Sequence, residues 1–457
     1  MTTMLTTKRL QELDGRHHLH PFTTYKDLAS KGSRIIARAE GVYLHDSEGN
    51  RILDGMAGLW CVQVGYGRQE LIEAGQRQLE TLAYYNTFFQ CSHPPAIELS
   101  AKLAEITPEG MDRIFFTNSG SEANDTVVKI VRYYWNLMGR PSKKIMIGRH
   151  YGYHGVTLAA ASLSGLAPMH PQADLPLAGF VHIDAPYVFE HGKGQDPDAF
   201  GLEAARALER KILELGPDNV GAFIGEPIQG AGGVIIPPRS YWPEIQRICA
   251  KYDVLLVADE VICGFGRTGN WWGSETFAFR PDIMSMAKGL SSGYQPIAAV
   301  ALGRRVGDVL FDADQEFVHG FTYSGHPVAC AVALANIDVM EREGLATRAA
   351  GALGAAFAER LGSLADHPMV GEVRTEGLIG AVELVADKAT GDRHPAGTEA
   401  GTRCRDACVA HGLVMRAVRD VMVVSPPLVI TPDQIDELVV KARAALDDVY
   451  ADLAGSR

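Results

Sequence analysis

Lys288 is the residue of this sequence that most directly suggests covalent chemistry. It lies in the stretch DIMSMAKGLSSGYQP (282–296), between an apolar run and a loop of glycines and serines, with no other charged residue from 283 to 296. Desolvated lysine loses its proton readily, and the neutral amine can form a Schiff base with a carbonyl group. On this segment alone a solvated lysine at a strand-to-helix turn is the favoured interpretation, so the rest of the chain must decide.

A second feature is the segment Ser119-Gly120-Ser121-Glu122, which follows the apolar strand pattern RIFFTN and precedes a long helical pattern. Small residues at a helix N-terminus can bind an anion, because the first N–H groups are free and the helix dipole favours negative charge. A plain capped helix, with Ser119 or Ser121 as the cap, is the alternative interpretation.

Two more strand ends carry residues suited to a ligand site. Tyr153 lies in the glycine-flanked segment YGYHG, where its ring could cover a planar ligand or pack within a loop, and His154 could contact the same ligand. Asp259 and Glu260 end the buried strand pattern VLLVADE. Buried carboxylates are costly unless they face a cation or a hydrogen-bond donor, although a helix cap or an ion pair would also explain them.

Taken together, these features fit one cofactor, pyridoxal 5'-phosphate. This cofactor needs a lysine for the Schiff base, an acid beside its pyridinium nitrogen and a phosphate-binding site. Asp259 and Lys288 are 29 residues apart, which leaves room for a loop and one further strand. The pattern GFGRTG at 264–269 matches a dinucleotide motif, but it does not directly follow a strand and no helical pattern follows it, so a nicotinamide dehydrogenase is disfavoured.

The composition restricts the class of protein and its partners. The 457 residues are too many for one compact core, and the hydrophobic content of 46% and charged content of 21% are ordinary for a globular protein. A net charge of −12 without a basic tract argues against nucleic-acid binding. The N-terminus resembles no secretion signal, and no apolar run could span a membrane. Seven scattered cysteines predict reduced thiols in a cytoplasmic protein.

The order of elements predicts an α/β fold. From about 94 to 333, short apolar strands alternate with helical stretches, which indicates a mainly parallel sheet covered on both faces. Residues 41–56 are typical of a β-hairpin, and the part after about 335 suits a smaller α+β domain. The expected division is an N-terminal segment packing with the small domain, a large cofactor-binding domain and a small C-terminal domain, at residues 1–65, 66–333 and 334–457.

Four long motifs resemble the class III, fold-type I pyridoxal-phosphate-dependent aminotransferases, and within them the ω-amine:pyruvate transaminases. They are EPIQGAGG, ADEVICGFGRTG, AKGLSSGYQPI and GFTYSGHP, and the resemblance extends from His17 to Leu428. It implies a large domain with a mainly parallel seven-stranded sheet, a smaller α+β domain, and a homodimer or tetramer with shared active sites. The histidines of HHLH (17–20) have no further ligand nearby in sequence, so no metal site is predicted.

The resemblance also assigns roles to particular residues. Lys288 would form the Schiff base and then move a proton between substrate and cofactor, and Asp259 would keep the pyridinium nitrogen protonated. The other expected cofactor contacts are Gly120 and Ser121 at the phosphate, Tyr153 and Val261 on the two ring faces, Glu226 in support, and Thr322 from the neighbouring subunit.

One departure from related enzymes concerns the substrate. Relatives that act on ornithine or γ-aminobutyrate carry a glutamate where this chain has Ala231, and that glutamate pairs with a mobile arginine. The matching Arg416 would therefore lack a carboxylate partner and be free to swing. Three aromatic residues match substrate-pocket positions, and core packing is the alternative for each: Phe22, Trp60 and Phe88. Tyr153 is expected to border the same pocket.

The predicted reaction transfers an amino group from a primary amine, ω-amino acid or diamine to pyruvate in two half-reactions, giving an aldehyde or ketone and alanine. The sequence leaves the amine open between polyamines, β-alanine, taurine and arylalkylamines. Two other reactions use the same fold and cofactor, namely decarboxylation of dialkylglycines and an intramolecular amino shift. A non-catalytic cofactor-binding protein is disfavoured, because the lysine, the acid and the phosphate segment are all present.

Overall fold

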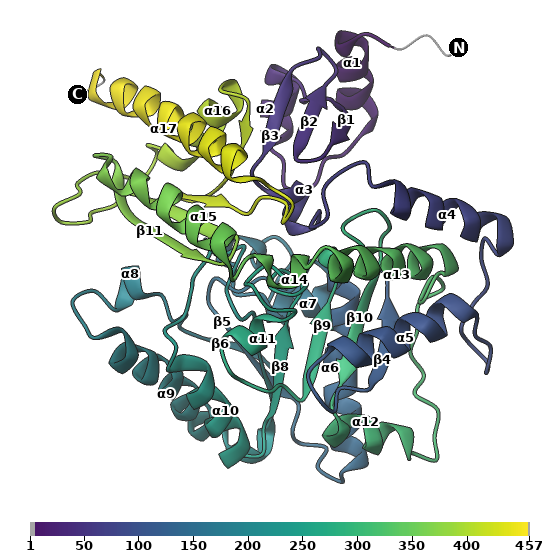
Figure 1. Ribbon diagram of the computed structural model, residues 1–457. Coiled ribbons are helices and arrows are strands. Elements are labelled where there is room, and N and C mark those ends of the chain that lie inside the picture. Colours follow the sequence, from purple (N-terminus) through teal and green to yellow (C-terminus); the bar gives the residue numbers. More distant parts are fainter. Residues whose placement is uncertain (1–4, 456–457) are drawn as a thin grey trace.

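The centre of the molecule is a seven-stranded sheet (Figure 1). The computed structural model describes residues 5–455. The strand order is β4 (Arg113–Thr117), β10 (Ala298–Leu302), β9 (Ile283–Met286), β8 (Leu255–Asp259), β7 (Val220–Gly225), β5 (Ile145–Arg149) and β6 (Phe180–Ile183). Only β10 runs antiparallel to its two neighbours in this sheet. The predicted mainly parallel α/β sheet is confirmed.

Both faces of this sheet are buried, which explains why its strands are apolar without alternation. All residues of β7 and β8 are buried. Phe223 and Leu256 pack into one hydrophobic cluster together with Trp242 of α10. Their neighbours Ile224 and Val257 point the other way, into the cluster formed with helix α6. The alternation of side chains along each strand thus joins two helical layers through one sheet.

The helices cover the sheets and connect their strands (Figure 1). They are α1 (Thr7–His17), α2 (Tyr25–Lys31), α3 (Ala57–Trp60), α4 (Gln69–Thr81), α5 (Pro94–Ile106), α6 (Gly120–Leu137), α7 (Leu158–Leu163), α8 (Val188–His191), α9 (Pro197–Leu215), α10 (Tyr241–Lys251), α11 (Gly273–Thr276), α12 (Arg304–Phe311), α13 (Pro327–Arg342), α14 (Leu345–Arg348), α15 (Ala352–Gly362), α16 (Ala400–Ala410) and α17 (Pro432–Gly455).

Strands from the N-terminal and C-terminal parts of the chain form one small sheet. Strands β1 (Ile36–Glu40), β2 (Tyr43–Asp46) and β3 (Arg51–Asp54) form an antiparallel unit that includes the expected hairpin. Strand β13 (Leu413–Val414) then pairs with β3 in parallel, with Leu413 opposite Leu53. The N-terminal segment therefore packs with the C-terminal part of the chain.

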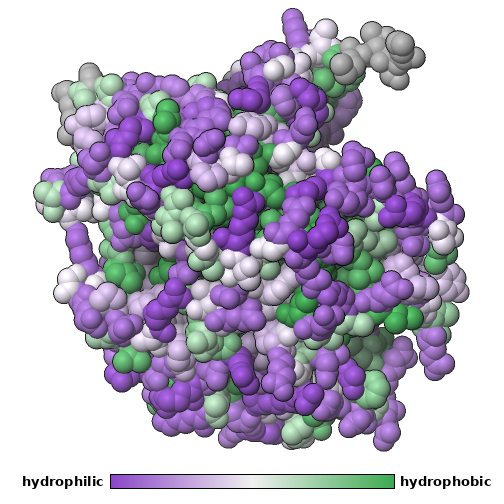
Figure 2. Space-filling model, in the orientation of Figure 1, coloured by the Kyte–Doolittle hydropathy of each residue, from purple (hydrophilic) through white to green (hydrophobic). Residues whose placement is uncertain are grey.

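A second small sheet completes the C-terminal part. Its order is β11 (Val370–Glu376), β12 (Ile379–Leu384), β15 (Val421–Val424) and β14 (Arg416–Val418), and all its pairs are antiparallel. Hydrophilic side chains predominate on the molecular face shown in Figure 2. Within the described residues, no helix is long and apolar enough to cross a membrane. None of the seven cysteines forms a disulfide.

Candidate active site

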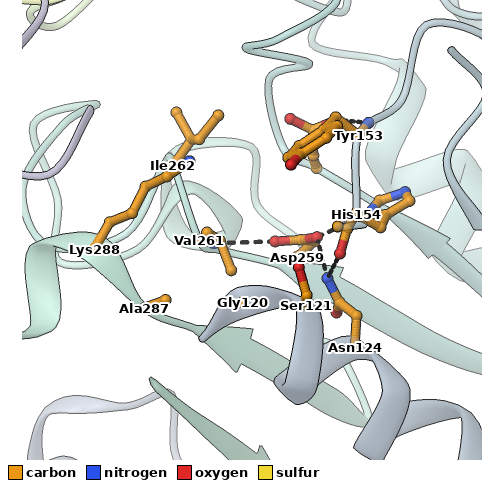
Figure 3. Close-up of a pocket in the computed structure, with 12 residues that line it drawn as sticks. Gly120, Ser121, Asn124, Tyr153, His154, Asp259, Val261, Ile262, Ala287 and Lys288 are labelled. Atoms are coloured by element: carbon orange, nitrogen blue, oxygen red, sulfur yellow. Dashed lines mark hydrogen bonds and ion pairs between the residues drawn. The ribbon is translucent and has the colours of Figure 1, made fainter. Parts of the chain in front are cut away.

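Loops from five strands of the large sheet meet around one cavity (Figure 3). Ligands of open α/β sheets bind at the carboxyl ends of the strands, and the lining residues follow β4, β5, β7, β8 and β9. The lining comprises Gly120, Ser121, Asn124, Tyr153, His154, Gly155, Glu226, Asp259, Val261, Ile262, Ala287 and Lys288. The structure thus brings together eight of the residues that the sequence analysis put forward.

Lys288 begins a short 3-10 helix (Lys288–Leu290) directly after β9. Its φ of 48° lies in the left-handed region, which is uncommon for a residue with a side chain and is often found at functional sites. The side chain of Asn336 fixes this turn by donating to the carbonyl oxygens of Gly289 and Leu290, at 2.8 and 3.1 Å. The backbone at Lys288 is therefore held from behind, and the side chain is left for the cavity.

The amino group of Lys288 is set up to act as a neutral amine. Its Nζ lies 5.2 Å from the ring centroid of Trp60. Among residues 5–455 it has no ion-pair partner within 4 Å, and burial lowers the pKa of Lys288. A lysine with a lowered pKa reacts with carbonyl groups more readily, because a larger fraction carries the free electron pair.

The carboxylate of Asp259 is buried and held by three donors. Its Oδ2 accepts from Asn124 Nδ2 at 2.8 Å and from His154 Nδ1 at 2.7 Å, and its Oδ1 accepts from the backbone of Val261 at 3.1 Å. These hydrogen bonds fix the orientation of the carboxylate. A carboxylate oriented in this way is suited to pairing with a protonated ring nitrogen.

Sequence reasoning missed four residues that line this cavity, namely Asn124, Gly155, Ile262 and Ala287, and Asn124 is the one with a polar side chain. It lies one helical turn after Gly120 on α6, so it points to the same side of the helix. Its Nδ2 also donates to the carbonyl oxygen of His154, at 2.7 Å. The spacing of four residues from Gly120 was the only signal in the sequence.

The start of α6 forms an anion site. Ser119 is the N-cap, and its side chain accepts from the backbone N–H of Glu122 at 3.2 Å. Ser121 Oγ accepts from the backbone N–H of Val156 at 3.1 Å and keeps its own O–H to donate to a ligand. A Cβ at Gly120 would come within 3.2 Å of the side chain of Val261, and one at Gly155 would come within 2.6 Å of Ser121 Oγ. The absence of side chains at both positions leaves the helix N-terminus accessible to phosphate.

Glu226 is a buried carboxyl that organises the backbone of the cavity. Its Oε1 accepts from the backbone N–H of Tyr153 at 3.0 Å, and its Oε2 accepts from that of Gly230 at 3.1 Å. Burial is the main cause that raises the pKa of Glu226 to about 6. Glu226 therefore fixes the segment of Tyr153 relative to the loop that carries Ala231.

Arg416, the first residue of β14, lies beside this cavity. Its guanidinium carbon is 5.0 Å from the ring centroid of Trp60, the same ring that Lys288 approaches. Within residues 5–455 the guanidinium group of Arg416 forms no ion pair and donates no hydrogen bond. Burial lowers the pKa of Arg416, and Ala231, itself buried, offers it no carboxylate. The arginine is thus close to the cavity and without an internal partner.

Six predicted residues are not among those that line the cavity: Trp60, Ala231 and Arg416, described above, and Phe22, Phe88 and Thr322. Thr322 is exposed, and its carbonyl oxygen accepts from Tyr84 Oη at 2.6 Å. The side chain of Phe22 is exposed, and Phe88 lines a separate cavity with Phe116 and His319. The roles of Thr322, Phe22 and Phe88 stay predictions.

Two other motifs have structural roles here. Arg267 of GFGRTG is buried and donates to the carbonyl oxygens of Leu378 and Pro426, at 2.9 and 2.6 Å, which joins the loop after β8 to the C-terminal part. In HHLH, His18 and His20 both bond to the carboxylate of Asp14, at 3.1 and 2.8 Å. Because the side chain of His18 is 61% exposed and the hydrogen bonds account for this arrangement, we do not assign it a metal.

These residues fit pyridoxal phosphate on grounds of chemistry. A half-buried lysine without an ionic partner, a buried aspartate and an open helix N-terminus surround one cavity, and Tyr153 and Val261 line it as well. The fold and the site define a fold-type I pyridoxal-phosphate-dependent enzyme.

Comparison with known proteins identifies the family. The model of the family Aminotransferase class-III matches residues 26–446, and the chain belongs to this family. The putrescine–pyruvate aminotransferase of Pseudomonas aeruginosa is 54% identical over 97% of both chains. The diaminobutyrate–2-oxoglutarate transaminase of Halomonas elongata is 42% identical over 98% of this chain and 97% of its own.

Solved structures agree with this assignment. An (S)-enantioselective omega-transaminase from Thermomicrobium roseum has a TM-score of 0.95 at 43% identity, covering 98% of this chain and 99% of its own. An omega transaminase from Pseudomonas jessenii in complex with PMP has a TM-score of 0.95 at 46% identity, covering 97% and 98%. The protein is therefore an aminotransferase, and its cofactor is pyridoxal 5'-phosphate.

Proposed function

We propose that this aminotransferase moves the amino group of a primary amine, a diamine or an ω-amino acid to pyruvate, giving an aldehyde or ketone and alanine. The observation that carries this proposal is Arg416, a cavity-side guanidinium with no carboxylate partner among the described residues. The 54% identity to a putrescine–pyruvate aminotransferase supports the same acceptor and places diamines among the first donors to test.

When bound, pyridoxal phosphate supplies an aldehyde that bonds to amines and a ring that stabilises negative charge on the neighbouring carbon. Lys288 holds the proton that moves at the substrate carbon, because it is the basic group of the cavity with a lowered pKa. Asp259, oriented by Asn124 and His154, keeps the ring nitrogen protonated. The N-terminus of α6 would bind the phosphate, and Tyr153 and Val261, which line the cavity, would contact the ring.

The pocket must accept an uncharged donor chain in one half-reaction and a carboxylate in the other. A desolvated guanidinium without a partner has an unfavourable free energy. Binding of the acceptor carboxylate therefore stabilises Arg416. In the donor half-reaction it turns toward solvent, and the ring of Trp60 provides an apolar wall. A glutamate at Ala231 would hold the arginine permanently, and this chain lacks it.

We further propose a homodimer, or a tetramer of such dimers, in which each active site receives Thr322, Phe22 and Phe88 from the neighbouring subunit. Their positions outside the cavity of their own chain support this. The seven free thiols support a cytoplasmic location. The pairing of β13 with β3 supports a division into 1–65, 66–333 and 334–457, with the first segment belonging to the small domain.

The experiment that tests the function is a donor profile with pyruvate as the fixed acceptor. Putrescine, β-alanine, taurine and an arylalkylamine are each incubated with the purified enzyme, and alanine is measured. Formation of alanine with at least one of these amines is expected. Carbon dioxide release from a dialkylglycine, or an intramolecular amino shift without any need for pyruvate, would replace the proposal with one of those reactions.

A further inference from the structure

The loop between β7 and α10 begins with Glu226, which lines the cavity, and it carries Ala231. We call its residues 226–235 the wall. Three successive carbonyl oxygens of this loop each face an arginine from the C-terminal part of the chain. Arg419 Nη2 lies 3.4 Å from the oxygen of Gly232. Arg374 Nη2 and Nε donate to the oxygens of Gly233 and Val234, at 2.5 and 2.7 Å. The position of the wall thus depends on two side chains that lie far from it in sequence.

Arg374 is itself fixed by a buried network. Its Nη1 donates to Glu383 Oε2 at 2.8 Å, and the side chain of Glu383 is fully buried. The other oxygen of Glu383 accepts from Arg393 Nη1 at 2.6 Å, and Tyr187 Oη donates to Glu383 as well. A buried carboxylate with two guanidinium partners and a phenol holds its neighbours in one geometry. Arg374 therefore reaches the loop from a rigid base on β11.

Arg419 joins the same wall to the strand of Arg416. It lies on the turn between β14 and β15, three residues after Arg416. Its guanidinium carbon is 4.2 Å from the ring centroid of Tyr151, a distance typical of a cation–π contact. Tyr151 comes two residues before Tyr153, and a Cβ at Gly232 would lie 2.5 Å from the carbonyl oxygen of Tyr151. Arg419 thus links Arg416, Tyr153 and the loop.

We infer that Arg374 and Arg419 are positioning residues that hold the 226–235 wall against the strand of Arg416 and so set the geometry of carboxylate recognition. We call this pair the arginine clamp. The inference rests on the proposed function, in which Arg416 binds the acceptor carboxylate. The donor half-reaction does not use this geometry, because Arg416 turns away from an uncharged amine.

Amide hydrogen exchange tests the clamp without reference to any substrate. The amides of Val234 and Ile235 are hydrogen-bonded within the loop, to Gly230 and Gln229, and report its stability. Arg374→Lys keeps the positive charge beside Glu383 but loses the fork that reaches two carbonyl groups. Amide exchange in the peptide 229–236 is expected to become about tenfold faster, because the loss of one net hydrogen bond makes opening of the loop more favourable by about that factor. Arg405→Ala, which removes an exposed arginine on α16 that contacts its neighbour Asp406, serves as the control with unchanged exchange.

Half-reaction kinetics then test the consequence for recognition. Arg419 lies at the surface. We expect Arg419→Ala to raise the apparent dissociation constant of pyruvate about threefold, because it removes one exposed cation–π contact. The amine half-reaction should stay unchanged. Unchanged exchange in 229–236, or equal losses in both half-reactions, would overturn the clamp. Failure of the wild-type enzyme to use pyruvate would instead sink the proposed function, while the exchange result would still decide whether the clamp exists.

Discussion

Arg416 lies against Trp60, with its guanidinium carbon 5.0 Å from the centroid of the indole ring. Lys288 approaches the same ring, at 5.2 Å from its Nζ. A single buried aromatic side chain therefore contacts both the amine that reacts with carbonyl groups and the cation that we assign to the acceptor carboxylate. Removal from water is the main cause that lowers the pKa of both groups, and the charge of Arg416 lowers the pKa of Lys288 a little further.

We expect Lys288→Ala to abolish turnover and covalent attachment of the cofactor. Borohydride reduction followed by peptide mass analysis should find the cofactor fixed to the peptide of Lys288 in the wild-type enzyme and to no peptide in the variant. Lys251→Ala, which removes an exposed lysine paired with Glu209, is the matched control and should label normally. An active Lys288→Ala enzyme would refute the assignment.

Asp259→Asn should preserve the fold and slow deprotonation of the substrate. The asparagine oxygen can still accept from His154 and Asn124, but the neutral amide no longer keeps the ring nitrogen charged. Single-turnover kinetics should show deprotonation slowed about 100-fold or more, the usual loss for a preorganised electrostatic partner. Amine binding should change far less. An unchanged deprotonation rate would contradict this role of Asp259.

Glu226→Gln should remove a pH dependence of stability. Burial raises the pKa of Glu226 from 4.5 to about 6, so the folded protein binds this proton more tightly than the unfolded chain. The stabilisation is present below pH 4.5 and is lost as the pH rises through 6, by about 2 kcal/mol in total. Urea unfolding between pH 4.5 and 7 should show wild type losing this amount relative to the variant. The exposed Glu98→Gln should track the wild type.

The sequence predicted the cavity well because its residues follow strands of one parallel sheet. Carboxyl ends of such strands meet at one edge, so Tyr153, Asp259 and Lys288 could be placed together from strand patterns alone. Asn124 was not predicted, because its contribution depends on the phase of α6 relative to Gly120 and on the distance to Asp259, which no local pattern records.

Contacts between parts of the chain that are distant in sequence could not be predicted from local sequence patterns. The parallel pair of Leu413 with Leu53 joins strands that are 360 residues apart in sequence. The contact of Arg374 with the loop at Gly233 likewise crosses from β11 to the large sheet. Residues that a second subunit would supply, such as Thr322, are exposed in the single chain, and only the resemblance to a family pointed to them.

A mixing experiment tests Thr322. If Thr322 crosses the interface, Lys288 of one chain and Thr322 of the other share a site. Heterodimers of Lys288→Ala chains with Thr322→Asp chains would then carry both lesions in one site and none in the other. Such heterodimers should recover about half of the wild-type activity per dimer. Heterodimers verified by differential tags that stay inactive would show that Thr322 acts within its own chain.

The last prediction concerns Arg416 and decides how the acceptor is recognised. Arg416→Ala removes a charge-assisted contact to the acceptor carboxylate, which contributes about 1.5–3 kcal/mol, or roughly 10- to 150-fold in binding. In Arg416→Ala, binding of pyruvate should weaken by that factor. The half-reaction with an uncharged monoamine should change little, because the arginine turns away from it.

Ala231→Glu should also weaken the binding of pyruvate, since the new carboxylate would pair with Arg416. Ala231→Gln provides the matched control of similar size without the charge. Each half-reaction can be followed separately by the absorbance of the cofactor. Equal losses with the monoamine and with pyruvate in Arg416→Ala would make the arginine a structural residue and remove the basis for dual recognition.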